Sequence, residues 1–106
     1  MSKLYAVVIM ILAASLPPVS AEAAEISGKA LYDRYCASCH PKGGNVIKPD
    51  KDLLRLSRES RGIRTAKDVV GRMRHPAGPQ MPRFDKSYIS DENALKIGEY
   101  VVSSFK

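Results

Sequence analysis

The chain has 106 residues, with 17 lysine and arginine residues against 11 acidic residues and a formal net charge of +6. This length limits the molecule to one domain once a leader is removed. Only two cysteines are present, which excludes a second cysteine pair that would compete for the same chemistry.

The first 21 residues have the pattern of a secretory signal peptide. Lys3 supplies a positive charge, an apolar run extends from Leu4 to Leu16, and the small residues up to Ala21 form a cleavage site. The run has 13 residues, whereas a transmembrane helix requires ~20. A cleaved leader is therefore favoured over an N-terminal membrane anchor.

We expect cleavage after Ala21, with Ala23 and Ala24 as alternative sites, and a mature domain at residues 22–106. A domain this small buries limited apolar surface and usually benefits from an additional stabilising element. The leader indicates export to a bacterial periplasm. We therefore expect no nucleic-acid partner and no membrane span in the mature form.

Apolar periodicity predicts helices and no strands in the mature domain. Apolar, aromatic and small residues recur at helical spacing over Gly28–Tyr35, which predicts a short helix that delivers residues 36–39 at its end. A brief helix is expected at Asp50–Leu56, capped by its first residue, with Leu53 and Leu54 facing inward.

The two later helices carry stronger signals. Residues 65–74 begin with a capping box of Thr65 and Asp68 and continue with an apolar stripe. The prolines and glycine of residues 76–82 predict a non-helical loop. A C-terminal helix is expected over Ser90–Phe105, capped by its first residue.

The five residues Cys36–His40 form the motif Cys-x-x-Cys-His, which is the attachment signal of c-type haem. Two thiols three positions apart can each form a thioether bond to one vinyl group of the haem. His40 is then brought beneath the iron as an axial ligand. We therefore predict that Cys36, Cys39 and His40 bind one covalent haem c, with His40 as a metal ligand.

Three other uses of the two cysteines are weaker alternatives. A structural zinc site would need both His40 and the distant His75, at an irregular spacing. A redox dithiol of the thioredoxin type needs a βαβ context, but runs of β-branched residues are absent outside the leader. A disulfide across two intervening residues closes a tiny loop and has little entropic benefit.

Met81 is the predicted sixth ligand of the iron. It lies between Pro79 and Pro82, where a rigid loop can hold its sulfur against the metal. A thioether ligand favours ferrous iron and so raises the reduction potential. Met73 falls on an apolar helical stripe and is expected in the core. His75 remains as an alternative ligand, as a neighbour of the haem propionates or as a surface residue.

These motifs together resemble the class I cytochromes c, above all the short photosynthetic and periplasmic bacterial members. Gly28, Tyr32 and Cys36 match the N-terminal helix of that family, and Met81–Phe84 matches its distal loop. The resemblance covers essentially the whole mature chain. It implies an all-α, small cytochrome c fold, in which about four short helices wrap around one covalent haem. It also places Gly28 where the C-terminal helix crosses closely.

The resemblance further implies a role for Pro49. The segment Gly43–Pro49 is similar to a family loop whose proline carbonyl accepts the Nδ1 proton of the axial histidine. Such a bond fixes the imidazole ring and raises its basicity. We also expect Pro41, directly after His40, to be a cofactor-binding residue.

Most of the surplus positive charge lies at residues 55–74, in a stretch that is not typical of the family. This stretch carries seven basic residues against two acidic ones. Arg55, Arg58, Arg61 and Arg64 are predicted to steer an acidic redox partner to the haem edge. The alternative is an ordinary solvated surface.

Together these residues predict a soluble, exported, monomeric carrier of single electrons with a positive potential. Two strong axial ligands leave no open position on the iron, so no catalytic residues are expected. A haem-bearing subunit of a larger oxidoreductase is the alternative, because it would use the same chemistry. A peroxidase or ligand sensor would need a labile sixth ligand.

Overall fold

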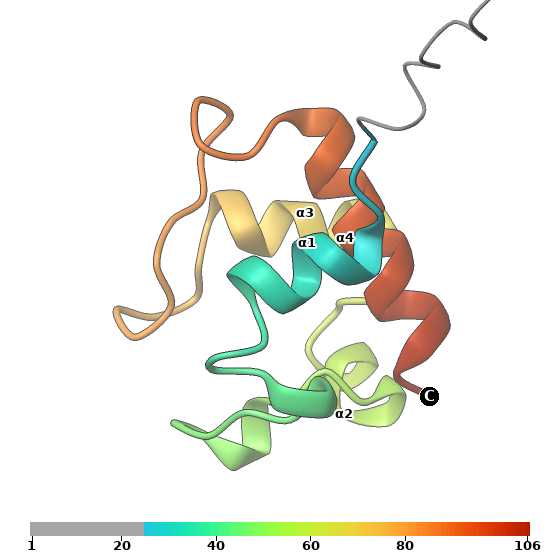
Figure 1. The fold of residues 1–106 in the computed structure, drawn as a ribbon. Coiled ribbons are helices and arrows are strands. Elements are labelled where there is room, and N and C mark those ends of the chain that lie inside the picture. The colour runs from blue at the N-terminus through green and yellow to red at the C-terminus, as the bar shows by residue number, and fades with distance from the viewer. Residues whose placement is uncertain (1–24) are drawn as a thin grey trace, which may run out of the picture.

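The computed structural model describes residues 25–106, so the expected signal peptide at residues 1–21 lies outside the described residues. This part of the chain forms the helices α1 (Gly28–Tyr35), α2 (Arg55–Ser60), α3 (Ala66–Arg74) and α4 (Asp91–Ser104) (Figure 1). Two short 3-10 helices, η2 (Pro41–Gly43) and η3 (Pro49–Lys51), lie between α1 and α2. The prediction of a small all-α fold is confirmed.

Side-chain caps start three of the four α-helices. The Ser27 hydroxyl accepts a hydrogen bond from the Ala30 amide at 3.1 Å at the start of α1. The predicted capping box of α3 is present, with Thr65 and Asp68 each bonded to the other's backbone amide. Ser90 caps α4 through the Asn93 amide at 3.2 Å, also as predicted.

The helix expected at Asp50–Leu56 is wrong in its position. Pro49 begins the 3-10 helix η3, which ends at Lys51, and α2 begins only at Arg55. The carboxylate of Asp52 accepts a hydrogen bond from the Leu54 amide at 3.3 Å, a local turn that competes with helix formation. Leu54 is consequently 44% exposed and does not face inward.

Helix α4 is the centre of the packing, because it contacts both α1 and α3 (Figure 1). Glycines allow both close approaches. A Cβ atom at Gly28 would overlap the carbonyl group of Lys96, and a Cβ at Gly98 would lie 2.5 Å from the Ala66 carbonyl oxygen. The role expected of Gly28 is confirmed, and Gly98 plays the same part against α3.

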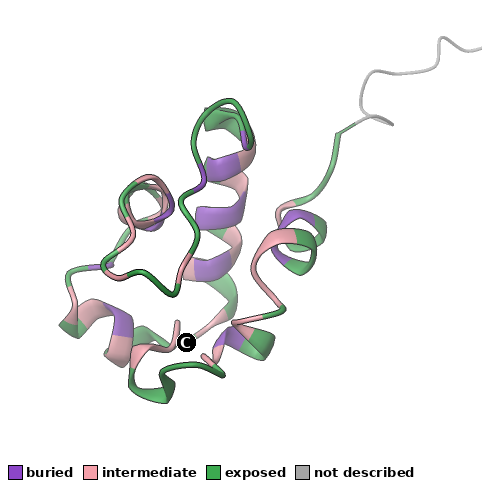
Figure 2. Cartoon of the chain, turned by 90° about the vertical axis from the view of Figure 1, so that its left-hand side faces the viewer, coloured by how far each residue is buried: buried purple, intermediate pink, exposed green. Residues whose placement is uncertain are grey.

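The buried residues extend along α4 and onto the segments around it (Figure 2). Met73 is in this core, as expected. The core residues are Leu31, Tyr32, Ile63, Val69, Met73, Phe84, Ile89, Ala94, Ile97 and Val101. None of the helices in the described part of the chain is long and apolar enough to cross a membrane.

Candidate haem site

A cavity brings together residues that are far apart in the chain. Cys36, Cys39 and His40 line it from the segment that follows α1, and Met81 lines it from the loop between α3 and α4. The space measures about 1260 Å³, part of which is open solvent. Both cysteines are free thiols. The four residues predicted to bind the haem and its iron therefore share one cavity.

The rest of the lining suits an apolar ring system that carries carboxylates. Leucine, isoleucine, valine, methionine and phenylalanine side chains form a large part of the wall, among them Leu53, Ile63, Val69, Met73, Phe84, Ile97 and Val101. The charged residues of the lining are Lys48, Lys51, Arg61 and Arg72, and no acidic residue is among them. An apolar porphyrin with two anionic propionates fits this combination of surfaces.

The backbone of the cysteine motif is held by hydrogen bonds to α1 and within the motif itself. Helix α1 ends at Tyr35, and the Cys36 amide donates to the Tyr32 carbonyl at 2.8 Å. The His40 amide then donates to the Cys36 carbonyl at 2.8 Å, so the motif forms one further turn. Burial raises the pKa of the Cys36 thiol to about 12, with a further contribution from Cys39.

The imidazole of His40 is oriented by the backbone of the following loop. Its Nδ1 atom lies 2.7 Å from the carbonyl oxygen of Gly44. A protonated Nδ1 leaves Nε2 without a proton, which is the form that coordinates iron. The partner inferred from the family resemblance, the carbonyl of Pro49, is not the one that the structure pairs with His40.

The backbone conformation after His40 explains this correction. Lys42 has a φ angle of 52° and Gly43 one of 78°, and this pair of left-handed residues reverses the chain. The reversal returns the Gly44 carbonyl to the imidazole. Pro49 instead starts η3, and neither Pro49 nor Pro41 belongs to the lining of the cavity.

A tyrosine side chain also holds the loop after His40 in place, through two hydrogen bonds. The Tyr32 hydroxyl donates to the His40 carbonyl and accepts a hydrogen bond from the Gly43 amide at 3.2 Å. Tyr32 is 2% exposed, and this burial is the main reason that its pKa rises to about 12. The hydroxyl is therefore neutral at physiological pH, where it bonds the residue that precedes η2 and the last residue of η2.

Phe105, the C-cap residue of α4, closes this side of the site. Its ring centroid lies 5.2 Å from that of Tyr32, and Tyr32 also packs against Tyr100 at 5.2 Å. A Cβ atom at Gly43 would lie 2.6 Å from the Phe105 ring. The aromatic cluster of Tyr32, Tyr100 and Phe105 thus supports the loop that orients His40.

The loop that carries Met81 is anchored at its far end by Arg74. The Phe84 amide donates to the Met73 carbonyl at 2.9 Å, and Arg74 donates to the carbonyls of Phe84 and Ile89. Arg74 also pairs with Asp91 at 2.8 Å, and this bond is the main reason that the pKa of Asp91 is lowered.

His75 occupies a different environment from Met81. It is the exposed C-cap of α3 and does not line the cavity, whereas Met81 is partly buried against the core. No group of three or more His, Cys, Asp or Glu side chains suited to a metal ion is found in residues 25–106. His75 thus lies outside the cavity that Cys36, Cys39 and His40 line, whereas a zinc site would need it beside them.

The arginines of residues 55–74 do not form one exposed patch. Arg58 is 2% exposed, so its expected role in steering a partner is wrong. Arg61 and Arg72 line the cavity, and Arg61 is bonded to the backbone of Asp52 and Ser57. Arg55 and Arg64 are exposed. Nothing in the spacing of these identical residue types distinguishes the buried arginine from the exposed ones.

The helical fold and the shared cavity of two thiols, a histidine and a methionine define the class of protein as a c-type cytochrome. Residues 23–101 match the family model described as cytochrome c oxidase, cbb3-type, subunit III. The chain belongs to this family, and with it to the class I c-type cytochromes, monohaem electron carriers that bind one covalent haem c.

Several known proteins are similar to this chain. OmcF, an outer membrane cytochrome from Geobacter sulfurreducens, is 51% identical, with a TM-score of 0.73 over 76% of this chain and 100% of that one. Cytochrome c6 from Synechocystis sp. is 35% identical over 75 residues, which are 71% of this chain and 61% of that protein.

A relative of a different kind is the cytochrome c subunit of 4-cresol dehydrogenase [hydroxylating] from Pseudomonas putida. It is 35% identical over 79 residues, which are 73% of this chain and 59% of that protein. The chain thus spans about three fifths of the length of these two curated relatives.

Proposed function

We propose that the chain is an exported electron carrier whose haem is attached through Cys36 and Cys39 and ligated by His40 and Met81. One observation carries the proposal: these four residues line a single cavity whose wall is apolar and whose charged residues are all basic. When bound, the haem supplies a one-electron couple between ferric and ferrous iron.

The residues of the chain prepare the site for that couple. Gly44 holds the His40 imidazole in the tautomer that coordinates iron, through the contact at Nδ1. Met81 offers a thioether that favours the ferrous state and a positive potential. With His40 and Met81 both as ligands, the iron would have no open position for a substrate, and the chemistry it would supply is electron transfer alone.

The basic residues of the cavity lining can interact with the propionate groups of the haem. Lys48, Lys51, Arg61 and Arg72 can neutralise the two propionates, which would otherwise place negative charge beside the iron. Redox partners of this carrier are proteins, and the exposed Arg55 and Arg64 favour partners with an acidic surface. The proposed location is the periplasm, on the basis of the leader pattern at residues 1–21.

Two measurements on the purified protein test the attachment and the ligands. Extraction with acidic acetone should leave the haem on the polypeptide, and the intact mass should equal the chain from about Glu22 plus one haem. The oxidised protein should show the near-infrared charge-transfer band of a sulfur ligand. Colour that passes completely into the organic phase, or absence of the band at neutral pH, would contradict the proposal.

A second candidate is a haem-bearing subunit of a larger oxidoreductase. The similarity to the 4-cresol dehydrogenase cytochrome c subunit supports it, because that relative serves within an enzyme. Purification from the natural source distinguishes the two: a free carrier elutes at the size of the monomer, whereas a subunit elutes in stoichiometric complex with one partner.

A further inference from the structure

Arg58 of α2 is a fully buried arginine whose side chain is bound only by backbone carbonyl groups. It is 2% exposed and is the one charged residue in the buried core of the described chain. Its Nε atom donates to the Leu53 carbonyl at 3.1 Å, and one terminal nitrogen donates to the Ile63 carbonyl at 3.3 Å. No ion pair within residues 25–106 involves Arg58.

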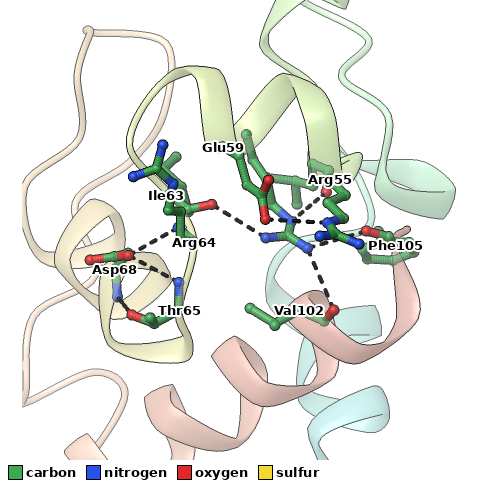
Figure 3. A network of polar contacts seen from close by, with 10 residues as sticks. Arg55, Glu59, Ile63, Arg64, Thr65, Asp68, Val102 and Phe105 are labelled. Atoms are coloured by element: carbon green, nitrogen blue, oxygen red, sulfur yellow. Dashed lines mark hydrogen bonds and ion pairs between the residues drawn. The ribbon is translucent and has the colours of Figure 1, made fainter.

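The other terminal nitrogen of Arg58 reaches the end of the chain. It lies 3.5 Å from the Val102 carbonyl and 3.4 Å from the Phe105 carbonyl, at the C-terminal end of α4. Figure 3 shows the carbonyl groups of Ile63, Val102 and Phe105 directed at one guanidinium group. The negative end of a helix favours a cation at this position.

The same carbonyl partners place Arg58 behind the wall of the haem cavity. Leu53 and Ile63 both line the cavity. The Leu53 amide also donates to the Gly43 carbonyl at 2.6 Å, within the loop that orients His40. The charge therefore lies on the far side of residues that face the haem, next to the His40 loop.

The charge of Arg58 is compensated differently from the charges of Arg55 and Arg74, each of which has a carboxylate partner. Arg55 has Glu59 at 3.3 Å, and Arg74 has Asp91 at 2.8 Å. Carbonyl dipoles satisfy the donors of Arg58 but carry no net charge. A unit charge that is buried and unpaired acts over a longer range than an exposed one, because water and salt screen it less.

Reduction of a ferric haem adds one electron, so a nearby positive charge stabilises the ferrous state more than the ferric state. We propose that Arg58 raises the reduction potential of the haem by its buried, unpaired charge, acting across the wall formed by Leu53 and Ile63. The proposal rests on the proposed haem site at His40. The charge of Arg58 would then be a second feature, besides the Met81 ligand, that favours the ferrous state.

The test compares variants of the full haem-containing protein by potentiometric titration followed in the visible spectrum. Arg58→Met keeps most of the side-chain volume and removes the charge. At a fixed applied potential, its ratio of ferrous to ferric protein should fall several-fold relative to wild type. Arg58→Lys keeps the charge and should stay close to wild type. Arg64→Met, at an exposed arginine of the same stretch, is the control and should leave the ratio unchanged.

If Arg58→Met fails to fold, a second uncharged variant provides the comparison. Arg58→Gln retains hydrogen-bond donors for the carbonyl groups but has no charge, and it should lower the ratio as Arg58→Met does. An unchanged ratio in both uncharged variants overturns the proposal. An equal fall in Arg58→Lys also overturns it, because the effect would then come from geometry. Failure of the haem site itself is recognised separately, since wild type would then lack a covalent haem spectrum.

Discussion

The hydroxyl group of Tyr32, in helix α1, donates a hydrogen bond to the backbone carbonyl of His40, eight residues later in the chain. The bond joins the helix that precedes the cysteine motif to the residue that ends it. Because the same hydroxyl accepts the Gly43 amide, one side chain satisfies two buried backbone groups around the axial ligand. Tyr32 thereby positions His40 without touching the haem cavity itself.

Removing only this hydroxyl should destabilise the folded protein. Tyr32→Phe keeps the ring in the aromatic cluster but leaves the His40 carbonyl and Gly43 amide without their partner. A buried unsatisfied group costs about 1–3 kcal/mol, and we expect a loss of this size in the free energy of unfolding by guanidinium chloride. Tyr35→Phe, at the end of the same helix, is the control. Equal effects of the two substitutions would contradict the role of the Tyr32 hydroxyl.

The raised pKa of Tyr32 predicts how this difference depends on pH. The folded state holds the pKa at about 12, above the ordinary value of 10.0, so the unfolded chain loses the proton first. The contribution of the hydroxyl is complete below pH ~10 and is lost as pH rises toward the folded pKa. The difference in unfolding free energy between wild type and Tyr32→Phe should therefore shrink above pH ~10. A constant difference through alkaline pH would show that Tyr32 is not the titrating group.

Loss of the distal sulfur should change the redox properties of the haem. Met81→Ala opens the sixth coordination position, so we expect a lower potential, loss of the near-infrared band and new affinity for imidazole or cyanide. Met73→Leu is the matched control, because Met73 is 2% exposed in the core and should leave the band in place. Loss of the band in Met73→Leu with its retention in Met81→Ala would reverse the assignment.

Two glycines should respond in opposite directions to alanine. Gly43→Ala introduces a Cβ 2.6 Å from the Phe105 ring at a φ angle of 78°. A left-handed φ and overpacking together predict a loss of about 2 kcal/mol or more in unfolding free energy. Gly71, in α3, has no atom within 4 Å of an added Cβ, and Gly71→Ala should stabilise by about 0.5–1 kcal/mol. Thermal unfolding measures both; a stable Gly43→Ala variant would show that the loop adapts.

The exposed arginines should affect the encounter with an anionic reactant. Reversing Arg55 and Arg64 to glutamate should slow reduction by an anionic iron complex such as hexacyanoferrate(II) at low salt, because the attractive field is lost. The difference from wild type should fade near physiological ionic strength, where screening acts over about 8 Å. The potential should change little. A rate that does not depend on ionic strength in either protein would favour the solvated-surface alternative.

Local signals in the sequence determined the elements that depend on neighbouring residues. The cap at Ser90, the capping box of Thr65 and Asp68, and the apolar stripe that buries Met73 involve residues within one or two helical turns, so periodicity and spacing predict them. The motif Cys36–His40 likewise indicates its chemistry within five residues. The start of α2 was mispredicted because Asp52 bonds a nearby amide, which competes with the helix.

Only the folded structure decided which partners these residues meet. The acceptor for His40 is Gly44 rather than Pro49, because two left-handed residues reverse the chain between them. Arg58 is buried while Arg55 and Arg64 are exposed, although all three are the same residue type in one stretch. The difference arises because the end of α4 returns to α2 and offers its carbonyl groups to Arg58 alone. The contacts of Arg58 with Val102 and Phe105 join residues more than 40 positions apart, and no local pattern encodes them.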